Sequence, residues 1–144
     1  MSANTRLVHA TPENVWEVLA DGWLYPLWVV GASRMRDVDE SWPELGSRIH
    51  HSVGVWPALI DDHTRVLEVT PGHHLKLRAR GWPLGEADVD LTLEAQGAET
   101  LVTIREDAVA GPGVLVPEPI KGLGIKWRNT ETLHRLALIA ENRP

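Results

Sequence analysis

The chain has 144 residues, of which 43% are hydrophobic and 24% are charged, and its formal net charge is −6. This composition is typical of one folded globular domain, here residues 1–144, and excludes a disordered chain. The negative charge disfavours binding to nucleic acid or anionic membranes, and no apolar run reaches the roughly 20 residues that span a bilayer. The absence of cysteine excludes disulfides and thiol chemistry, and because residues 1–10 show no secretory signal we expect a cytoplasmic protein.

Local patterns predict a strand, two short helices, six further strands and a long helix, in that order. The first strand is expected over residues 5–10. Thr11-Pro12-Glu13 then begins a helix, because Thr caps helices, Pro suits the first position and Glu favours the positive end. This helix ends at Asp21-Gly22, and a second short helix or turn covers residues 24–29. Turn residues divide the rest into strands over 32–39, 47–55, 58–69, 74–80, 86–95 and 100–108, before a helix over 120–142.

This order of elements predicts the architecture. Consecutive strands joined by short turns form an antiparallel meander, and a sheet with one apolar face needs a cover. The helix over residues 120–142 is the obvious cover. We therefore expect an α+β fold, in which a seven-stranded curved antiparallel sheet wraps around the long C-terminal helix. An apolar cavity is expected between the sheet and that helix.

The hairpin formed by residues 74–80 and 86–94 has one register in which both faces match. One face becomes a ladder of opposite charges, with the pairs Arg80–Glu86, Arg78–Asp88 and Lys76–Asp90. The other face is wholly apolar, with the pairs Ala79–Ala87, Leu77–Val89 and Leu75–Leu91. A shift of one residue would destroy both sets. The basic side chains therefore belong to a paired, solvated outer face, which argues against a nucleic-acid site.

The next hairpin places a carboxylate on the apolar face. Pairing Ala95 with Thr100 brings Leu91 opposite Ile104 and Val89 opposite Glu106. A buried carboxylate must find a partner or take up a proton, because desolvation penalises its charged form. Glu106 is therefore the candidate catalytic residue. The alternative is that it lies near the open end of the sheet and bonds a backbone group or an arginine.

The turn Thr70-Pro71-Gly72-His73 leaves two registers open. A three-residue loop matches Val69 to Leu75 and Leu67 to Leu77, and it places Arg65, His63 and Asp61 on the inner face. A loop of two or four residues places Glu68, Val66 and Thr64 there instead. We favour the first register because it pairs apolar residues. Arg65 is then a candidate partner for Glu106.

The long helix changes character along its length. Its inner stripe is defined by Leu133, Leu136, Ala137 and Ala140, at the spacing of one helical face. Extended towards the N-terminus, this stripe reaches Asn129 and Thr130, then Lys126, Ile125 and Gly122. The inner face therefore becomes small and polar in this half, which would leave room for a ligand. The alternative is that these first turns fray towards solvent, which Gly122 and Gly124 would favour.

Seven tryptophans stand beside one tyrosine and no phenylalanine. Tryptophan either replaces phenylalanine in the core or lines a ligand cavity, and four tryptophans are expected near its mouth: Trp28, Trp56, Trp82 and Trp127. Of the adjacent residues His50 and His51 one faces inward, and the sequence does not choose. His63 and Asp61 offer two ligands where zinc needs at least three, so we expect no metal and no cofactor.

The chain resembles the SRPBCC superfamily of START-like, helix-grip domains over nearly its whole length. It looks most similar to the polyketide cyclase/dehydrase-like branch found in bacteria. The segments that carry the resemblance are residues 11–16, 23–31, 45–47, 69–72, 80–87, 105–107 and 127–136. The resemblance implies a helix-grip fold. It does not select a function, because the superfamily includes lipid carriers, receptors and aromatic cyclases.

Three functional hypotheses follow. The first is a carrier or sensor for a small hydrophobic or aromatic molecule, lipid-like or polyketide-like, in a cavity walled by Leu75, Leu77, Val89, Leu91 and Ile104. The second is a cofactor-independent cyclase or aromatase, in which Glu106 acts as acid or base and Arg65, His63 or Asn129 steers a carbonyl oxygen. The third is a protein–protein interaction module whose cavity is filled by tryptophan. The sequence does not indicate the ligand or the oligomeric state.

Overall fold

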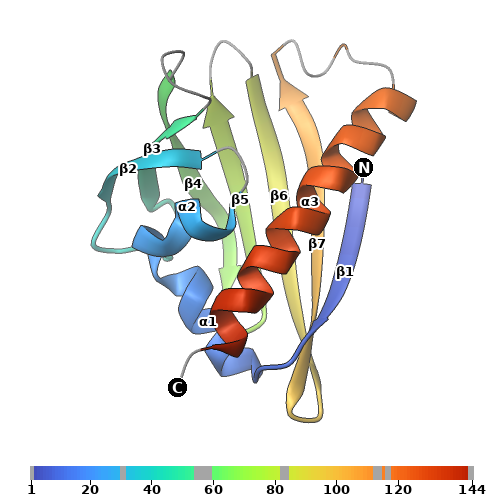
Figure 1. Ribbon diagram of the computed structural model, residues 1–144. Helices are drawn as coiled ribbons and strands as arrows, with labels where there is room; N and C mark the ends of the chain where they lie inside the picture. Colours follow the sequence, from blue (N-terminus) through green and yellow to red (C-terminus); the bar gives the residue numbers. More distant parts are fainter. Residues whose placement is uncertain are drawn as a thin grey trace.

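The computed structural model describes residues 2–29, 32–53, 60–81, 85–111, 115 and 118–142. Strand β1 (Ser2–Val8) is followed by helix α1 (Pro12–Ala20), the 3₁₀ helix η1 (Gly22–Leu24) and helix α2 (Tyr25–Trp28). Six strands follow: β2 (Ala32–Val38), β3 (Arg48–Val53), β4 (Ile60–Thr70), β5 (His74–Gly81), β6 (Gly85–Gln96) and β7 (Glu99–Ala110). Helix α3 (Glu118–Glu141) ends the fold (Figure 1). The predicted order of elements is confirmed, with β1 lying slightly earlier than expected.

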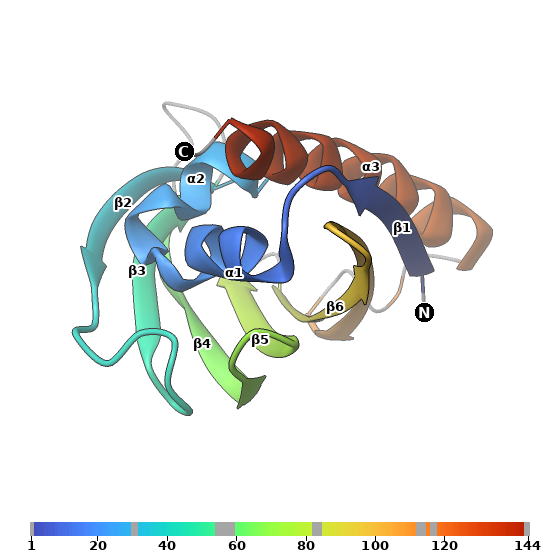
Figure 2. The same cartoon turned by 90° about the horizontal axis from the view of Figure 1, so that it is seen from below.

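The strands form one antiparallel seven-stranded sheet in the order β1-β7-β6-β5-β4-β3-β2. The meander runs from β2 to β7, and β1 then pairs with the last strand of the meander. Seen from below, the sheet curves around α1, and α3 lies across its open side (Figure 2). The predicted α+β fold is confirmed. Among the described residues, no helix is long and apolar enough to cross a membrane.

Helix α1 begins and packs as the sequence predicts. The Thr11 side chain accepts a hydrogen bond from the backbone N–H of Asn14, and Pro12 occupies the first turn. Val15, Val18 and Leu19 recur on one face and are buried in the core. This helix fills the inner side of the curved sheet near the C-terminal end of α3 (Figure 2).

Helix α3 packs against β1, α1 and α2. Its predicted inner stripe is confirmed, because Leu133, Leu136, Ala137 and Ala140 are all buried. Both halves of α3 form hydrogen bonds with β1 or with the residue that follows it. The Asn4 Nδ2 donates to the Lys126 carbonyl at 3.1 Å and to the Thr130 Oγ1 at 2.9 Å. The backbone N–H of His9 donates to Glu141 at 2.9 Å.

The registers predicted for β5, β6 and β7 are confirmed pair by pair. Arg80 lies opposite Glu86, Leu77 opposite Val89, and Val89 opposite Glu106. Of the predicted charged pairs, Arg78–Asp88 is an ion pair, in which the Arg78 Nε donates to the Asp88 Oδ1 at 2.6 Å. This interaction raises the pKa of Arg78 above its ordinary value. Lys76 and Arg80 instead lie 3.5 Å from Glu68 and 3.3 Å from Asp62, both on β4.

The register predicted for β4 is correct only next to the turn. Val69 pairs with Leu75 as expected, but the register shifts between Val66 and Glu68, so that Val66, and not Leu67, pairs with Leu77. This β-bulge leaves one extra residue in β4 and reverses the faces of the residues that precede it. Among residues 61–70 of this strand, the buried side chains are therefore those of Val66 and Thr64.

Because of this bulge, the predicted inward orientation of Arg65, His63 and Asp61 is wrong. Arg65 lies between Arg48 and Arg78 in the register, on the face opposite to buried Thr64. His63 lies opposite His50, and its ring contacts the Asp62 carboxylate. The Asp61 side chain is 64% exposed. Arg65 is therefore not the partner of Glu106.

Candidate functional site

The inner face of β5, β6 and β7 forms an apolar wall. Leu77, Leu91 and Ile104 are at most 1% exposed, as the predicted registers require. Val89 belongs to the same face and is partly buried. Towards the β5–β6 turn the inner positions are small and only partly buried: Ala79, Ala87 and Ala108. The interior is thus tightly packed beside α1 and less covered at the opposite end of these strands.

Glu106 projects from β7 into this interior and forms an ion pair with Arg128 of α3. The Glu106 carboxylate is 5% exposed, which confirms its predicted inward orientation. The Arg128 side chain is 39% exposed, so the pair lies at the border of the interior. Desolvation lowers the pKa of Arg128 from its ordinary value, and the nearby Tyr25 partly offsets this effect. The pair connects the sheet to the helix that covers it.

A chain of hydrogen bonds connects α2 to β3 and β4 inside the fold. The Tyr25 hydroxyl lies 3.2 Å from the Thr64 Oγ1, and the His51 Nε2 lies 2.7 Å from the same oxygen. The Tyr25 ring also stacks on the His51 ring, with centroids 5.6 Å apart, and meets the Trp28 ring edge-on at 5.3 Å. We refer to Tyr25, Trp28, His51 and Thr64 as the aromatic–polar cluster.

The titratable groups of the aromatic–polar cluster are neutral near pH 7. Burial lowers the pKa of His51 to about 4, because the protonated ring would be desolvated. Burial likewise raises the pKa of Tyr25, although the hydrogen bond with Thr64 opposes this effect. The cluster therefore adds polarity to the interior without adding charge.

Three buried nitrogens in this region have no hydrogen-bond partner among the described residues: Trp28 Nε1, His51 Nδ1 and Asn129 Nδ2. Their side chains are each at most 2% exposed. Asn129 comes from α3, which packs against the helix that carries Trp28. An unpaired buried donor is unfavourable by about 1–3 kcal/mol, so such groups gain from a ligand that pairs with them.

The hydrogen-bond chain can run in either direction. If Tyr25 donates to Thr64 and Thr64 donates to the His51 Nε2, the ring proton lies on Nδ1 and has no acceptor among the described residues. In the reverse direction the ring proton lies on Nε2, Nδ1 is an unpaired acceptor, and the Tyr25 proton has no acceptor among the described residues. The Trp28 Nε1 and the Asn129 Nδ2 are donors in both cases.

Of the predicted polar and aromatic site residues, Trp28 and Asn129 lie in this region, whereas Trp127, His63 and Arg65 do not. Trp28 is buried and not at a mouth, and Trp127 is 71% exposed on α3 and faces solvent. The His63 and Arg65 side chains lie on the other face of β4, as described above. Trp56 and Trp82 fall outside the described residues. Asn129 does face inward, whereas its predicted neighbours Thr130 and Lys126 are exposed.

Sequence reasoning missed Arg128 and Tyr25, left His51 undecided, and placed Thr64 on the inner face only in the register that was not favoured. Arg128 adjoins Asn129 in the sequence, but its approach to Glu106 depends on how α3 lies against β7. Thr64 was hidden by the bulge in β4. His51 is the inward member of its pair, whereas His50 bonds Asp39 at 3.2 Å on the other face.

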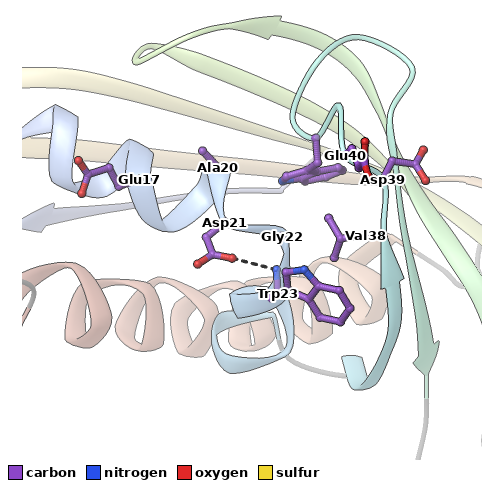
Figure 3. Close-up of a pocket in the computed structure, with 9 residues that line it drawn as sticks. Glu17, Ala20, Asp21, Gly22, Trp23, Val38, Asp39 and Glu40 are labelled. Atoms are coloured by element: carbon purple, nitrogen blue, oxygen red, sulfur yellow. Dashed lines mark hydrogen bonds between the residues drawn. The ribbon is translucent and has the colours of Figure 1, made fainter.

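A separate pocket of about 490 Å³ opens on the outside of the fold, between the α1–η1 junction and the β2–β3 connection (Figure 3). Its lining includes Glu17, Asp21, Asp39 and Glu40. Two of these carboxylates accept hydrogen bonds from nearby backbone N–H groups. Asp21 accepts from the backbone N–H of Trp23 at 3.2 Å, and Asp39 accepts from that of Arg48 at 2.9 Å. This pocket is distinct from the interior site.

The chain matches the model of one protein family over residues 2–141, and this family is described as "Polyketide cyclase / dehydrase and lipid transport". No curated protein matches the chain. Within the described part of the chain, no group of three or more His, Asp or Glu side chains is arranged to hold a metal ion.

Solved structures with the same fold come from several sources. An aromatase/cyclase named Zhui from Streptomyces sp. R1128 is 20% identical with a TM-score of 0.74, covering 98% of this chain and 93% of that one. Protein CV1439 from Chromobacterium violaceum is 19% identical with a TM-score of 0.68, covering 98% and 97%. Ara h 8.0201 is 8% identical with a TM-score of 0.74, covering 98% and 97%. At these identities the similarity establishes the fold, in agreement with the helix-grip prediction.

Proposed function

The chain belongs to the polyketide cyclase, dehydrase and lipid transport family, and on this premise we propose that it binds a small hydrophobic or aromatic molecule between its sheet and α3. In this proposal the protein acts as a carrier or sensor, in the cytoplasm. The Zhui protein, an aromatase/cyclase, shares the fold and supports a ligand of aromatic character.

The observation that carries the proposal is the meeting of an apolar wall with buried, unpartnered polar atoms. Leu77, Leu91 and Ile104 supply apolar surface, and Trp28 and Asn129 supply unpaired nitrogens beside it. Binding sites for small molecules combine these two features, because apolar contact gives affinity and a few polar groups fix orientation. A protein–protein module also has an apolar interior, but it has no need of unpaired polar atoms there.

A second candidate function is catalysis by Glu106. Its carboxylate is buried and held by Arg128, so it is fixed in position next to the apolar wall. A positioned carboxylate can move a proton to or from a bound carbonyl compound, and the nearby neutral His51 and Tyr25 can bond the oxygen. Replacing Glu106 by Gln separates the two functions, because a carrier still binds its ligand and an enzyme loses its reaction.

The test is native mass spectrometry of gently purified protein, beside denaturing spectra of the same sample. We expect an extra mass that disappears on denaturation. A matched pair of variants locates the ligand. Val89→Trp fills the inner face at its less covered end, whereas Val109→Trp adds the same bulk at an exposed position of β7.

Binding that survives in Val109→Trp and is lost in Val89→Trp supports the proposed site. Equal retention in both variants places the ligand elsewhere. A clean apo mass, with no uptake from a library of lipophilic compounds, contradicts the proposal and favours an interaction module.

A further inference from the structure

We propose that the interior site selects an uncharged ligand with a carbonyl oxygen at its buried end, in preference to a hydrocarbon of the same shape or a carboxylate such as a fatty acid. This inference rests on the proposed function and specifies the chemistry of its ligand. It follows from two observations. Buried hydrogen-bond donors have no partner among the described residues, and the Arg128 guanidinium is already paired with the Glu106 carboxylate.

The first step concerns hydrogen bonding. The Trp28 indole nitrogen can only donate, and the Asn129 Nδ2 can only donate. In either direction the hydrogen-bond chain through Thr64 leaves one further donor unpaired, the His51 Nδ1 or the Tyr25 hydroxyl. The Asn4 Oδ1 on β1 is an unpaired acceptor, but the unpaired nitrogens of Trp28 and Asn129 are donors. These donors favour a ligand atom that accepts, and a carbonyl oxygen has two lone pairs for this purpose.

The second step is that the donors belong to one region. The Tyr25 ring contacts both the Trp28 ring and the His51 ring, so these two side chains flank a single aromatic residue. Helix α2, which carries Tyr25 and Trp28, packs against α3, which carries Asn129. The donors of Trp28 and Asn129 are thus carried by two helices that pack against each other.

The third step concerns charge. The guanidinium of Arg128 is already paired with the Glu106 carboxylate. The titratable groups of the aromatic–polar cluster, His51 and Tyr25, are neutral near pH 7 because they are buried. A ligand carboxylate would find no free cation among these residues and would lose its hydration, which is strongly unfavourable. A neutral carbonyl has no such penalty.

The experiment compares three probes that share one ring system: fluorenone, fluorene and fluorene-9-carboxylate. Affinity for the full chain is measured by calorimetry at pH 7. We expect fluorenone to bind about tenfold more tightly than fluorene, as one net hydrogen bond implies, and the carboxylate to bind most weakly. In ¹H–¹⁵N spectra, fluorenone but not fluorene should shift the indole resonance of Trp28, which is assigned with Trp28→Phe.

Asn129→Leu provides the matched variant, because it keeps the side-chain size and removes the donors. We expect it to lower the affinity for fluorenone towards that for fluorene, and to leave fluorene binding unchanged. Trp28→Phe gives a second test if that variant fails to fold.

Each outcome has a distinct meaning. Equal binding of fluorene and fluorenone overturns the inference but upholds the proposed function. Tightest binding of the carboxylate also overturns the inference, because it shows an available cation. Failure of all three probes, together with a clean apo mass, overturns the proposed function itself.

Discussion

Glu106 on β7 and Arg128 on α3 form an ion pair across the interior, so the sheet and the helix that covers it are joined by charge as well as by apolar packing. The carboxylate is almost fully buried, whereas the guanidinium is partly exposed. The pair is therefore asymmetric. Loss of the acid leaves a cation that can still reach water, whereas loss of the base leaves a buried anion.

This asymmetry predicts the order of two mutational effects. Arg128→Met should lower the free energy of unfolding by about 3 kcal/mol, and Glu106→Gln by about half as much, since an unpaired buried charge is the larger penalty. Urea unfolding at pH 7 measures both changes. The control is Glu131→Gln, which breaks the half-exposed Glu131–Arg135 pair of the same helix and should change stability by less than about 0.5 kcal/mol. A smaller loss for Arg128→Met than for Glu106→Gln would contradict this account.

The Thr64 hydroxyl forms hydrogen bonds with two buried rings, those of Tyr25 and His51. Its loss should therefore lower the free energy of unfolding even when the size of the side chain is kept. Thr64→Val keeps the shape but leaves the Tyr25 hydroxyl and the His51 Nε2 without their shared partner. We expect a loss of about 1–3 kcal/mol in the free energy of unfolding. Thr103→Val, on the same sheet but at a partly exposed position, is the control and should be nearly neutral. Equal effects of the two substitutions would show that the buried chain has no energetic role.

The lowered pKa of His51 predicts a specific dependence of stability on pH. The unfolded ring has a pKa near 6.5 and the folded ring a pKa of about 4, so between these values the unfolded state binds more protons. The contribution of His51 to the free energy of unfolding should therefore be fully present above pH 6.5. It should fall by roughly 3 kcal/mol as the pH drops to 4.

Carboxylates titrate in the same range, so the measurement is the difference between wild type and His51→Gln in urea unfolding at several pH values. We expect this difference to shrink as the pH falls from 6.5 to 4. His50→Gln, on the partly exposed face, provides the control and should not remove the dependence. A pH-independent difference for His51→Gln would rule out the buried, neutral ring.

Gly22 is required by a close approach between η1 and the β2–β3 region. A Cβ at this position would lie 2.6 Å from the Val38 Cγ1 and 3.2 Å from the Trp42 Cδ1. We expect Gly22→Ala to lower the midpoint of thermal unfolding, with a loss of about 1–3 kcal/mol. In the Val38→Ala background the Val38 methyl groups are absent. Gly22→Ala should therefore lower the free energy of unfolding by less in this background than it does in the wild type. An equal loss in both backgrounds would point to a backbone requirement instead.

The sequence determined the registers of β5, β6 and β7 because two independent patterns had to agree. Opposite charges on one face and apolar residues on the other allow only one alignment, and this alignment carried Glu106 to the inner face. The same reasoning applied to α3, where the apolar stripe led back to Asn129.

The β4 strand shows why other parts of the site could not be predicted. A bulge adds one residue without any distinctive sequence, and it exchanged Thr64 for Arg65 on the inner face. The choice between His50 and His51 likewise depended on neighbouring strands, since both residues are compatible with either face. The pairing of Glu106 with Arg128 required the relative position of α3 and β7, which no local pattern encodes.

The pairing of β1 with β7 also bears on how the molecule reaches its folded state. Ser2 lies beside Glu106 and Val8 beside Thr100, so the partners are about a hundred residues apart in the chain. While the protein is being synthesised, β1 has no strand to join until β7 has left the ribosome, and it gains its contacts with α3 later still. The hairpins of β4 to β7 are local and can form first. We therefore expect the interior, and with it any capacity to hold a ligand, to close only after these hairpins have formed.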